Sequence, residues 1–163
     1  MRRAFTSVLI ALTLALTVAS GAWASFNISC VGNAWRPELS LDASGQPQAG
    51  GIIVSPPTAG RISIWGGNTD QIWTVCVRQR AVGAGQWPAQ VKLHVRRSSS
   101  GSGGAATIGD DANGYQQLGL TDTPLFHGSG DVLGIAVQVM VTGVEPGMLS
   151  RDYASQIIFT VRP

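Results

Sequence analysis

The regular alternation of apolar and polar residues is the feature that most constrains the fold of this chain. Val91, Leu93 and Val95 alternate with polar neighbours, and residues 133–142 and 153–162 repeat the pattern over longer runs. Successive side chains of a β-strand point to opposite faces, so a period of two indicates a strand with one buried face. These three segments are therefore predicted strands, and residues 133–142, the longest run, are expected to form a central one.

The remaining chain shows shorter apolar runs that are separated by turn residues. We expect further strands at residues 26–30, 38–41, 52–54, 61–65, 72–78 and 115–120. No segment sustains an apolar period of 3.6 residues over three turns, and residues 98–104, which are all serine or glycine, are expected to form a mobile loop. The sequence thus predicts an all-β antiparallel β-sandwich of about nine strands.

The inward face of this sandwich follows from the same alternation. The residues expected to be buried in the core are Val91, Leu93, Val95, Leu133, Ile135, Val137, Val139, Ile157, Phe159 and Val161.

The first 24 residues have the form of a secretory signal peptide. Arg2 and Arg3 open the segment, residues 8–18 are uncharged, and residues 22–24, Ala-Trp-Ala, match a signal-peptidase site. The apolar core of this leader is too short to span a bilayer, and no later run is long enough, so no membrane span is expected. We expect an exported protein, located in the periplasm, at the cell surface or outside the cell.

Residues 25–163 form the expected mature chain, and their 139 residues suit a single domain. Without Arg2 and Arg3 this part carries nine basic and nine acidic residues, and Lys92 is its one lysine. Such a chain has no basic patch of the kind that nucleic acids attract, so a nucleic-acid partner is not expected.

Cys30 and Cys76 are the only two cysteines, and an even pair in an exported chain predicts a disulfide. They lack C-x-x-C spacing, and neither His94 nor His127 belongs to a ligand pattern, so neither a metal site nor a cofactor is expected. In the strand at 72–78 the alternation turns Cys76 away from the apolar face, where it would suit a bridge to the first strand.

The sequence favours a protein that is not an enzyme. Neither His94 nor His127 lies near a nucleophile motif such as G-x-S-x-G, and His94 alternates with charged residues, which predicts a solvent-facing side chain. Asp110, Asp111 and Asn113 offer oxygen ligands to calcium, but their spacing departs from the known loop motif. A tight turn before the next strand explains them better.

The mature chain holds four tryptophans. Trp73 shares a face with apolar strand neighbours and is expected to be buried. Trp35 and Trp87 lie just before prolines at the junctions of loops and strands, so they are the candidate binding residues for a ligand such as a carbohydrate.

The cysteine positions and the final strand carry a family resemblance. Cys30 in the first strand, Cys76 in an early strand, and residues 151–153, Arg-Asp-Tyr, leading into the alternating end of the chain, resemble chaperone–usher-type pilin subunits, especially the spore-coat-U-like class. The resemblance implies an immunoglobulin-like sandwich that lacks one strand. It also implies as partners a periplasmic chaperone and neighbouring pilus subunits, which supply that strand by β-augmentation.

One feature departs from the family pattern. A donor strand normally precedes the first cysteine, but only residues 25–29 do so here. We therefore expect a subunit that accepts a strand without giving one, or a self-contained sandwich. The leading hypothesis is a non-catalytic structural or adhesive subunit at the cell surface that acts in pilus-like assembly, and the alternative is a stand-alone secreted ligand-binding module.

Overall fold

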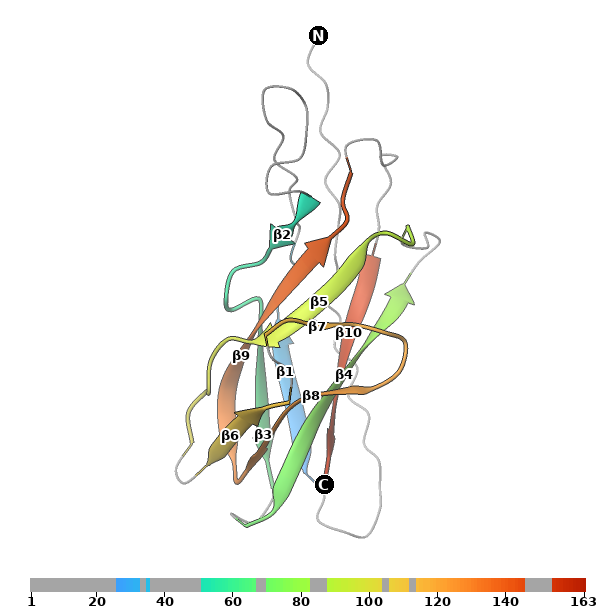
Figure 1. The fold of residues 1–163 in the computed structure, drawn as a ribbon. Helices are drawn as coiled ribbons and strands as arrows, with labels where there is room; N and C mark the ends of the chain where they lie inside the picture. The colour runs from blue at the N-terminus through green and yellow to red at the C-terminus, as the bar shows by residue number, and fades with distance from the viewer. Residues whose placement is uncertain are drawn as a thin grey trace.

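The computed structural model describes residues 26–32, 35, 51–66, 70–82, 88–103, 106–111, 114–145 and 154–163. In these ranges the chain is all-β, and its strands form two antiparallel sheets that lie face to face (Figure 1). The expected signal peptide and the expected strand at 38–41 lie outside the described residues.

The first sheet is built around the strand that the sequence identifies as central. Its members are β1 (Asn27–Gly32), β2 (Ile53–Val54), β3 (Gly60–Trp65), β5 (Lys92–Arg97), β7 (Gln116–Gln117) and β9 (Val132–Thr142). They follow the order β1-β3-β9-β5-β7, and β2 pairs with the far end of β9. Because β9 has eleven residues, it pairs with β3 along its first half and with β2 along its second half.

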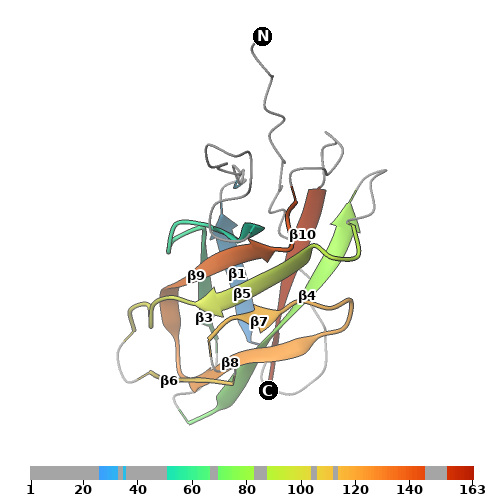
Figure 2. The ribbon, with the colours of Figure 1, turned by 45° about the horizontal axis from the view of Figure 1, so that its top comes forward.

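The second sheet covers the other side of the core. Its members are β4 (Ile72–Val82), β6 (Thr107–Asp110), β8 (Thr123–Ser129) and β10 (Ala154–Arg162), in the order β10-β4-β8-β6. Nine consecutive residue pairs join β10 to β4, so the end of the chain is a full strand of this sheet, as its alternation predicts. Figure 2 shows β10 and β4 running side by side, and β8 pairs with the other side of β4.

Two strands of the second sheet were not predicted from the alternation of apolar and polar residues. Neither β6 nor β8 was expected, because glycine interrupts both and β8 also contains Pro124. In β8 a bulge sets Phe126 opposite Val75 and Pro124 opposite Cys76, so that Leu125 and Phe126 are both buried. A bulge adds a residue to one strand and breaks the period of two, which removes the strand signal.

Both sheets contribute to one hydrophobic core, which includes Ile62 and Ile64 from β3 and Trp73, Val75 and Val77 from β4. The residues of the expected core that are buried as expected are Leu93, Val95, Ile135, Val137, Val139, Ile157 and Phe159. Val91 and Val161 are half-buried at its margin.

Leu133 contradicts the expected core, because 55 % of its surface is exposed. Its neighbour Gly134 has a φ of 68°, and the pairing between β3 and β9 shifts by one residue at this point. The bulge turns Leu133 outward while Val132 and Ile135 remain buried.

In the part of the chain that the structure describes, each sheet ends in an unpaired edge strand on the same side of the molecule. Among the described residues, β10 pairs only with β4, and β1 pairs only with β3. These two edge strands lie next to each other without a hydrogen-bonded ladder between them (Figure 1). Ile28 and Cys30 of β1 face the core but are only half-buried, unlike the core residues of β3.

Candidate functional site

The serine- and glycine-rich loop after β5 is held in place by the neighbouring strand β9. The Ser98 amide donates to the Ala136 carbonyl at 2.8 Å, and Ser102 and Leu133 exchange two backbone hydrogen bonds of 2.8 and 2.7 Å. The loop therefore continues the path of β5 along β9. These backbone contacts tie the described part of the expected mobile loop to β9, and serine and glycine composition alone does not reveal them.

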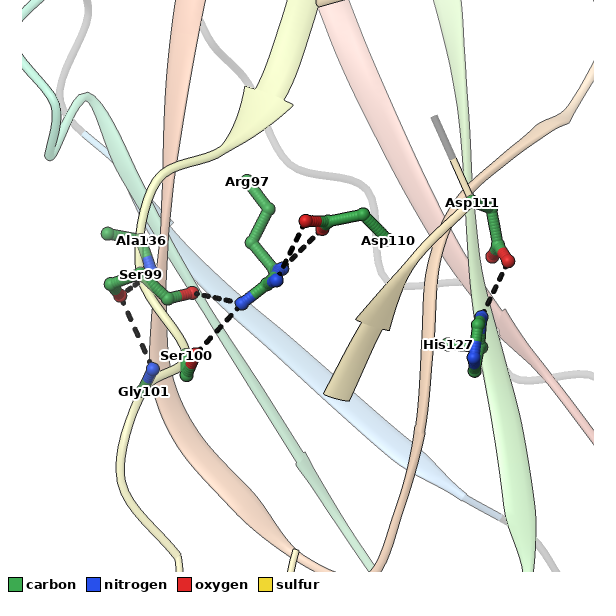
Figure 3. A network of polar contacts seen from close by, with 8 residues as sticks. All are labelled: Arg97, Ser99, Ser100, Gly101, Asp110, Asp111, His127 and Ala136. Carbon is green, nitrogen blue, oxygen red and sulfur yellow. Dashed lines mark hydrogen bonds and ion pairs between the residues drawn. The ribbon is translucent and has the colours of Figure 1, made fainter. Parts of the chain in front are cut away.

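Arg97 organises this loop from the end of β5 (Figure 3). Its guanidinium donates to both carboxylate oxygens of Asp110, at 2.6 and 2.9 Å. The third nitrogen, Nη1, donates to the Ser99 carbonyl at 3.3 Å and to Ser100 Oγ at 3.0 Å. A bidentate arginine–carboxylate pair fixes the direction of both side chains, so Arg97 ties β6 to the loop.

The acidic cluster near residue 110 is divided between two partners. Asp110 faces Arg97, whereas Asp111 contacts His127 Nδ1 at 2.5 Å on the other side of the strand (Figure 3). The two carboxylates therefore do not converge on a common point. Asn113 lies outside the described residues, and within them no group of histidine, cysteine and acidic side chains is arranged to hold a metal ion.

A pocket of about 350 Å³ opens where the loop meets the bulge of β9. Its lining residues are Arg61, Ser99, Gly101, Ser102, Leu133 and Gly134. Gly101 allows the close approach of the two segments, because its φ is 67° and a Cβ there would lie 2.5 Å from the Leu133 carbonyl oxygen. The pocket thus arises from two local irregularities of the first sheet.

None of the pocket residues was proposed as a binding residue from the sequence, and Leu133 was expected in the core. The available signal was Gly134, a glycine inside a strong strand pattern, which indicates a bulge. Arg61 and the loop line the same pocket because β3 pairs with β9, and no local sequence signal predicts this.

The outer face of the second sheet carries an ion-pair cluster centred on Asp122. Its carboxylate pairs with Arg162 of β10 and lies 3.3 Å from Arg78 Nε, and it also accepts a hydrogen bond from Thr160 at 3.3 Å. The Arg78 contact is an ion pair without hydrogen-bond geometry. Asp122 precedes β8, so this cluster fastens the connection before β8 onto β4 and β10.

The expected disulfide between Cys30 and Cys76 is not formed, and both thiols are free. Cys30 packs against the core between the sheets, and burial raises its pKa to about 12. Cys76 pairs with Thr160 and alternates with core residues Val75 and Val77, so it lies on the outer face of the second sheet. A β-sheet separates the two sulfur atoms, which is the physical reason that they do not meet.

The arrangement of the histidines offers no nucleophile–base pair within the described residues. His127 contacts Asp111, and its ring lies over Gly109, where a Cβ would come within 2.7 Å of Nε2. The Cys76 thiol has no hydrogen-bond partner among the described residues, and burial is the main factor that raises its pKa. His94 was expected to face solvent, but its side chain is half-buried beside Thr142. This burial lowers its pKa.

The described tryptophans are Trp35, Trp65 and Trp73, and Trp73 is the one among them that is fully buried. Trp73 is fully buried, as expected, and its indole nitrogen donates to the Gly130 carbonyl at 2.8 Å. Trp35, a candidate binding residue, is half-buried and packs against the core. Trp87, the other candidate, lies outside the described residues. Trp65 at the end of β3 is 39 % exposed and was not proposed from the sequence.

Comparisons of this chain with protein-family models, with curated proteins and with solved structures gave no match. None of the segments that the structure describes forms a helix with the length and apolar character needed to cross a membrane.

Proposed function

We propose that this chain is an exported, non-catalytic subunit that acts at the cell surface by accepting a β-strand from a partner. The proposed fold is an immunoglobulin-like sandwich that lacks one strand, as in the chaperone–usher pilins that the sequence resembles. In this role a periplasmic chaperone and then a neighbouring subunit are the partners. The signal-peptide pattern of residues 1–24 supports the export step.

The observation that carries the proposal is the pair of adjacent open edges, β1 and β10. β10 has nine residues and, within the described part of the chain, a partner on one side only. An edge strand presents a row of unpaired amide and carbonyl groups, which is a template for an added strand.

The burial of the two edges supports the same proposal. In β10 the core residues Ile157 and Phe159 are buried. In β1, by contrast, the core-facing side chains of Ile28 and Cys30 are only half-buried. A donated strand with apolar residues at alternate positions would pair with the edge of β10 and cover the apolar side chains of β1. Backbone pairing and apolar burial then act together.

The proposal is tested by tethering a donor strand to residues 25–163. A flexible linker of about eight residues after Pro163 leads into a ten-residue strand of alternating valine and threonine. We expect the tethered strand to raise the midpoint of urea unfolding and to suppress self-association of the chain. The matched control carries the same composition with two prolines in the strand, which prevents ladder hydrogen bonds.

An equal midpoint for the valine–threonine strand and the proline control would contradict the proposal. A chain that unfolds reversibly as a monomer and gains nothing from the tethered strand would be a complete sandwich. That result would favour the alternative, a stand-alone binding module.

A further inference from the structure

We propose that the pocket between β3, the loop after β5 and the bulge of β9 binds the carboxylate of an acidic sugar, such as a uronic acid residue. The pocket lies on the first sheet, away from the open edge of β10. Ligand binding at this pocket would be separate from strand acceptance at β10, so the proposed surface subunit would have a ligand of its own.

Arg61 supplies the positive charge of this pocket. Its side chain has no ion-pair or hydrogen-bond partner among the described residues, in contrast to Arg97 and Arg162, which pair with aspartates. Nη1 of Arg61 lies near Gly134, 3.9 Å from where a Cβ would stand. None of the described residues that line the pocket is acidic, so no carboxylate among them competes for the Arg61 guanidinium. An unpaired guanidinium fork matches the geometry of a carboxylate.

Ser99 adds a neutral hydrogen-bond donor. Its Oγ accepts hydrogen bonds from the Ala136 amide at 2.8 Å and from the Gly101 amide at 3.3 Å (Figure 3). A hydroxyl oxygen has two acceptor lone pairs and one proton, so its O–H remains available to donate. The Arg97 contacts to Ser99 and Ser100 hold this part of the loop in place before a ligand arrives. Preorganised donors favour an anionic or hydroxyl-bearing ligand.

Leu133 distinguishes an acidic sugar from a small inorganic anion. Its side chain lines the pocket and is 55 % exposed, because the bulge turns it away from the core. An apolar wall beside a charged donor suits a ring that carries both C–H groups and a carboxylate, whereas sulfate or phosphate gains nothing from it. The volume of about 350 Å³ lies at the lower end of ligand pockets, which suits a single sugar residue.

The test is a titration of ¹⁵N-labelled residues 25–163 with sodium glucuronate, followed by amide chemical shifts. We expect shifts centred on the pocket residues, at Gly101, Ser102 and Gly134. Neutral glucose is the ligand control, and sodium sulfate is the inorganic anion control. We expect glucuronate to bind at least about tenfold more tightly than either, because only glucuronate offers both the carboxylate and the ring.

Arg61→Gln removes the charge, and we expect it to weaken glucuronate binding at least about tenfold with an unchanged unfolding midpoint. The matched control is Arg80→Gln, which removes an exposed arginine from β4 of the other sheet and is expected to leave binding unchanged. Leu133→Asp is a second variant that places a carboxylate beside Arg61, and we expect it to abolish binding without a core change, because Leu133 is exposed.

Three results would overturn the inference. Binding of glucuronate to Arg61→Gln or Leu133→Asp with the affinity of the unmodified chain would show that the pocket is not the site. Sulfate binding as tight as glucuronate binding would show an unselective anion site. An absence of shifts with glucuronate at low ionic strength would show that no such site exists. None of these results depends on whether the edge of β10 accepts a strand.

Discussion

Replacement of Gly128 by alanine should destabilise the protein strongly, because Gly128 provides the space for Trp73. A Cβ at residue 128 would lie 2.5 Å from Cη2 of Trp73 and 2.4 Å from the backbone oxygen of Thr107. Trp73 is fully buried, donates to the Gly130 carbonyl and meets Phe126 edge to face, with ring centroids 6.2 Å apart. The added methyl group must therefore displace either the indole or the backbone of β6.

The magnitude follows from the contacts that such a displacement weakens. Overpacking of a core costs about 1 to 3 kcal/mol. The loss of the indole hydrogen bond adds about 1 kcal/mol, and a disturbed aromatic pair adds about 0.5 to 1.5 kcal/mol. Since these terms overlap, we expect Gly128→Ala to lower the free energy of unfolding by about 3 kcal/mol.

The assay is urea unfolding of residues 25–163, followed by tryptophan fluorescence and circular dichroism. The matched control is Gly119→Ala, because the nearest atom to a Cβ there is the Thr121 amide nitrogen at 4.0 Å and its φ is not positive. We expect the control to change stability by less than about 1 kcal/mol. A loss below about 0.5 kcal/mol for Gly128→Ala would refute the packing of β8 and β6 against Trp73.

Three further predictions concern charges and thiols. Asp122→Asn should lower stability by about 1 kcal/mol at low salt and by less in 1 M NaCl, measured by urea midpoints, because it weakens two partly exposed ion pairs. Cys30 and Cys76 should both react with iodoacetamide in denaturant without reductant, which a mass measurement would show. In the folded protein Cys30 should react very slowly, because burial raises its pKa to about 12. Two unreactive cysteines in denaturant would instead indicate a disulfide. Burial lowers the pKa of His94 in the folded state, so the unfolded chain binds the proton at a higher pH than the folded chain does. The free energy of unfolding should therefore fall as the pH drops below about 6.5. His94→Gln should flatten this dependence of stability on pH, and an unchanged dependence would refute the lowered pKa of His94.

The period of two located the regular strands well, because alternation records which face of a strand is buried. β9 and β10 were identified in this way, and Ile135 and Phe159 lie in the core as expected. The pattern failed at bulges. Leu133 follows the alternation of β9, yet the left-handed Gly134 turns it outward.

The candidate pocket could not be predicted from the sequence, because it depends on which strands pair. Arg61 and Ser99 are distant in the chain and come together only through their shared neighbour β9. The alternation placed Cys76 correctly on the outward face of its strand, but the expected bridge to the first strand is absent, because β1 belongs to the other sheet. Cys30 faces the core from β1, whereas Cys76 lies on the outer face of β4.

The central claim is that β10 is an open edge that awaits a partner strand, and amide hydrogen exchange tests it most directly. In the isolated chain of residues 25–163, we expect alternate amides of β10 to exchange rapidly, because an edge strand directs every second amide away from its single partner, β4. The amides of β9 at Val137, Met140 and Val141, which pair with a strand on each side, should be protected. Uniform protection along β10, equal to that of β9, would contradict the account.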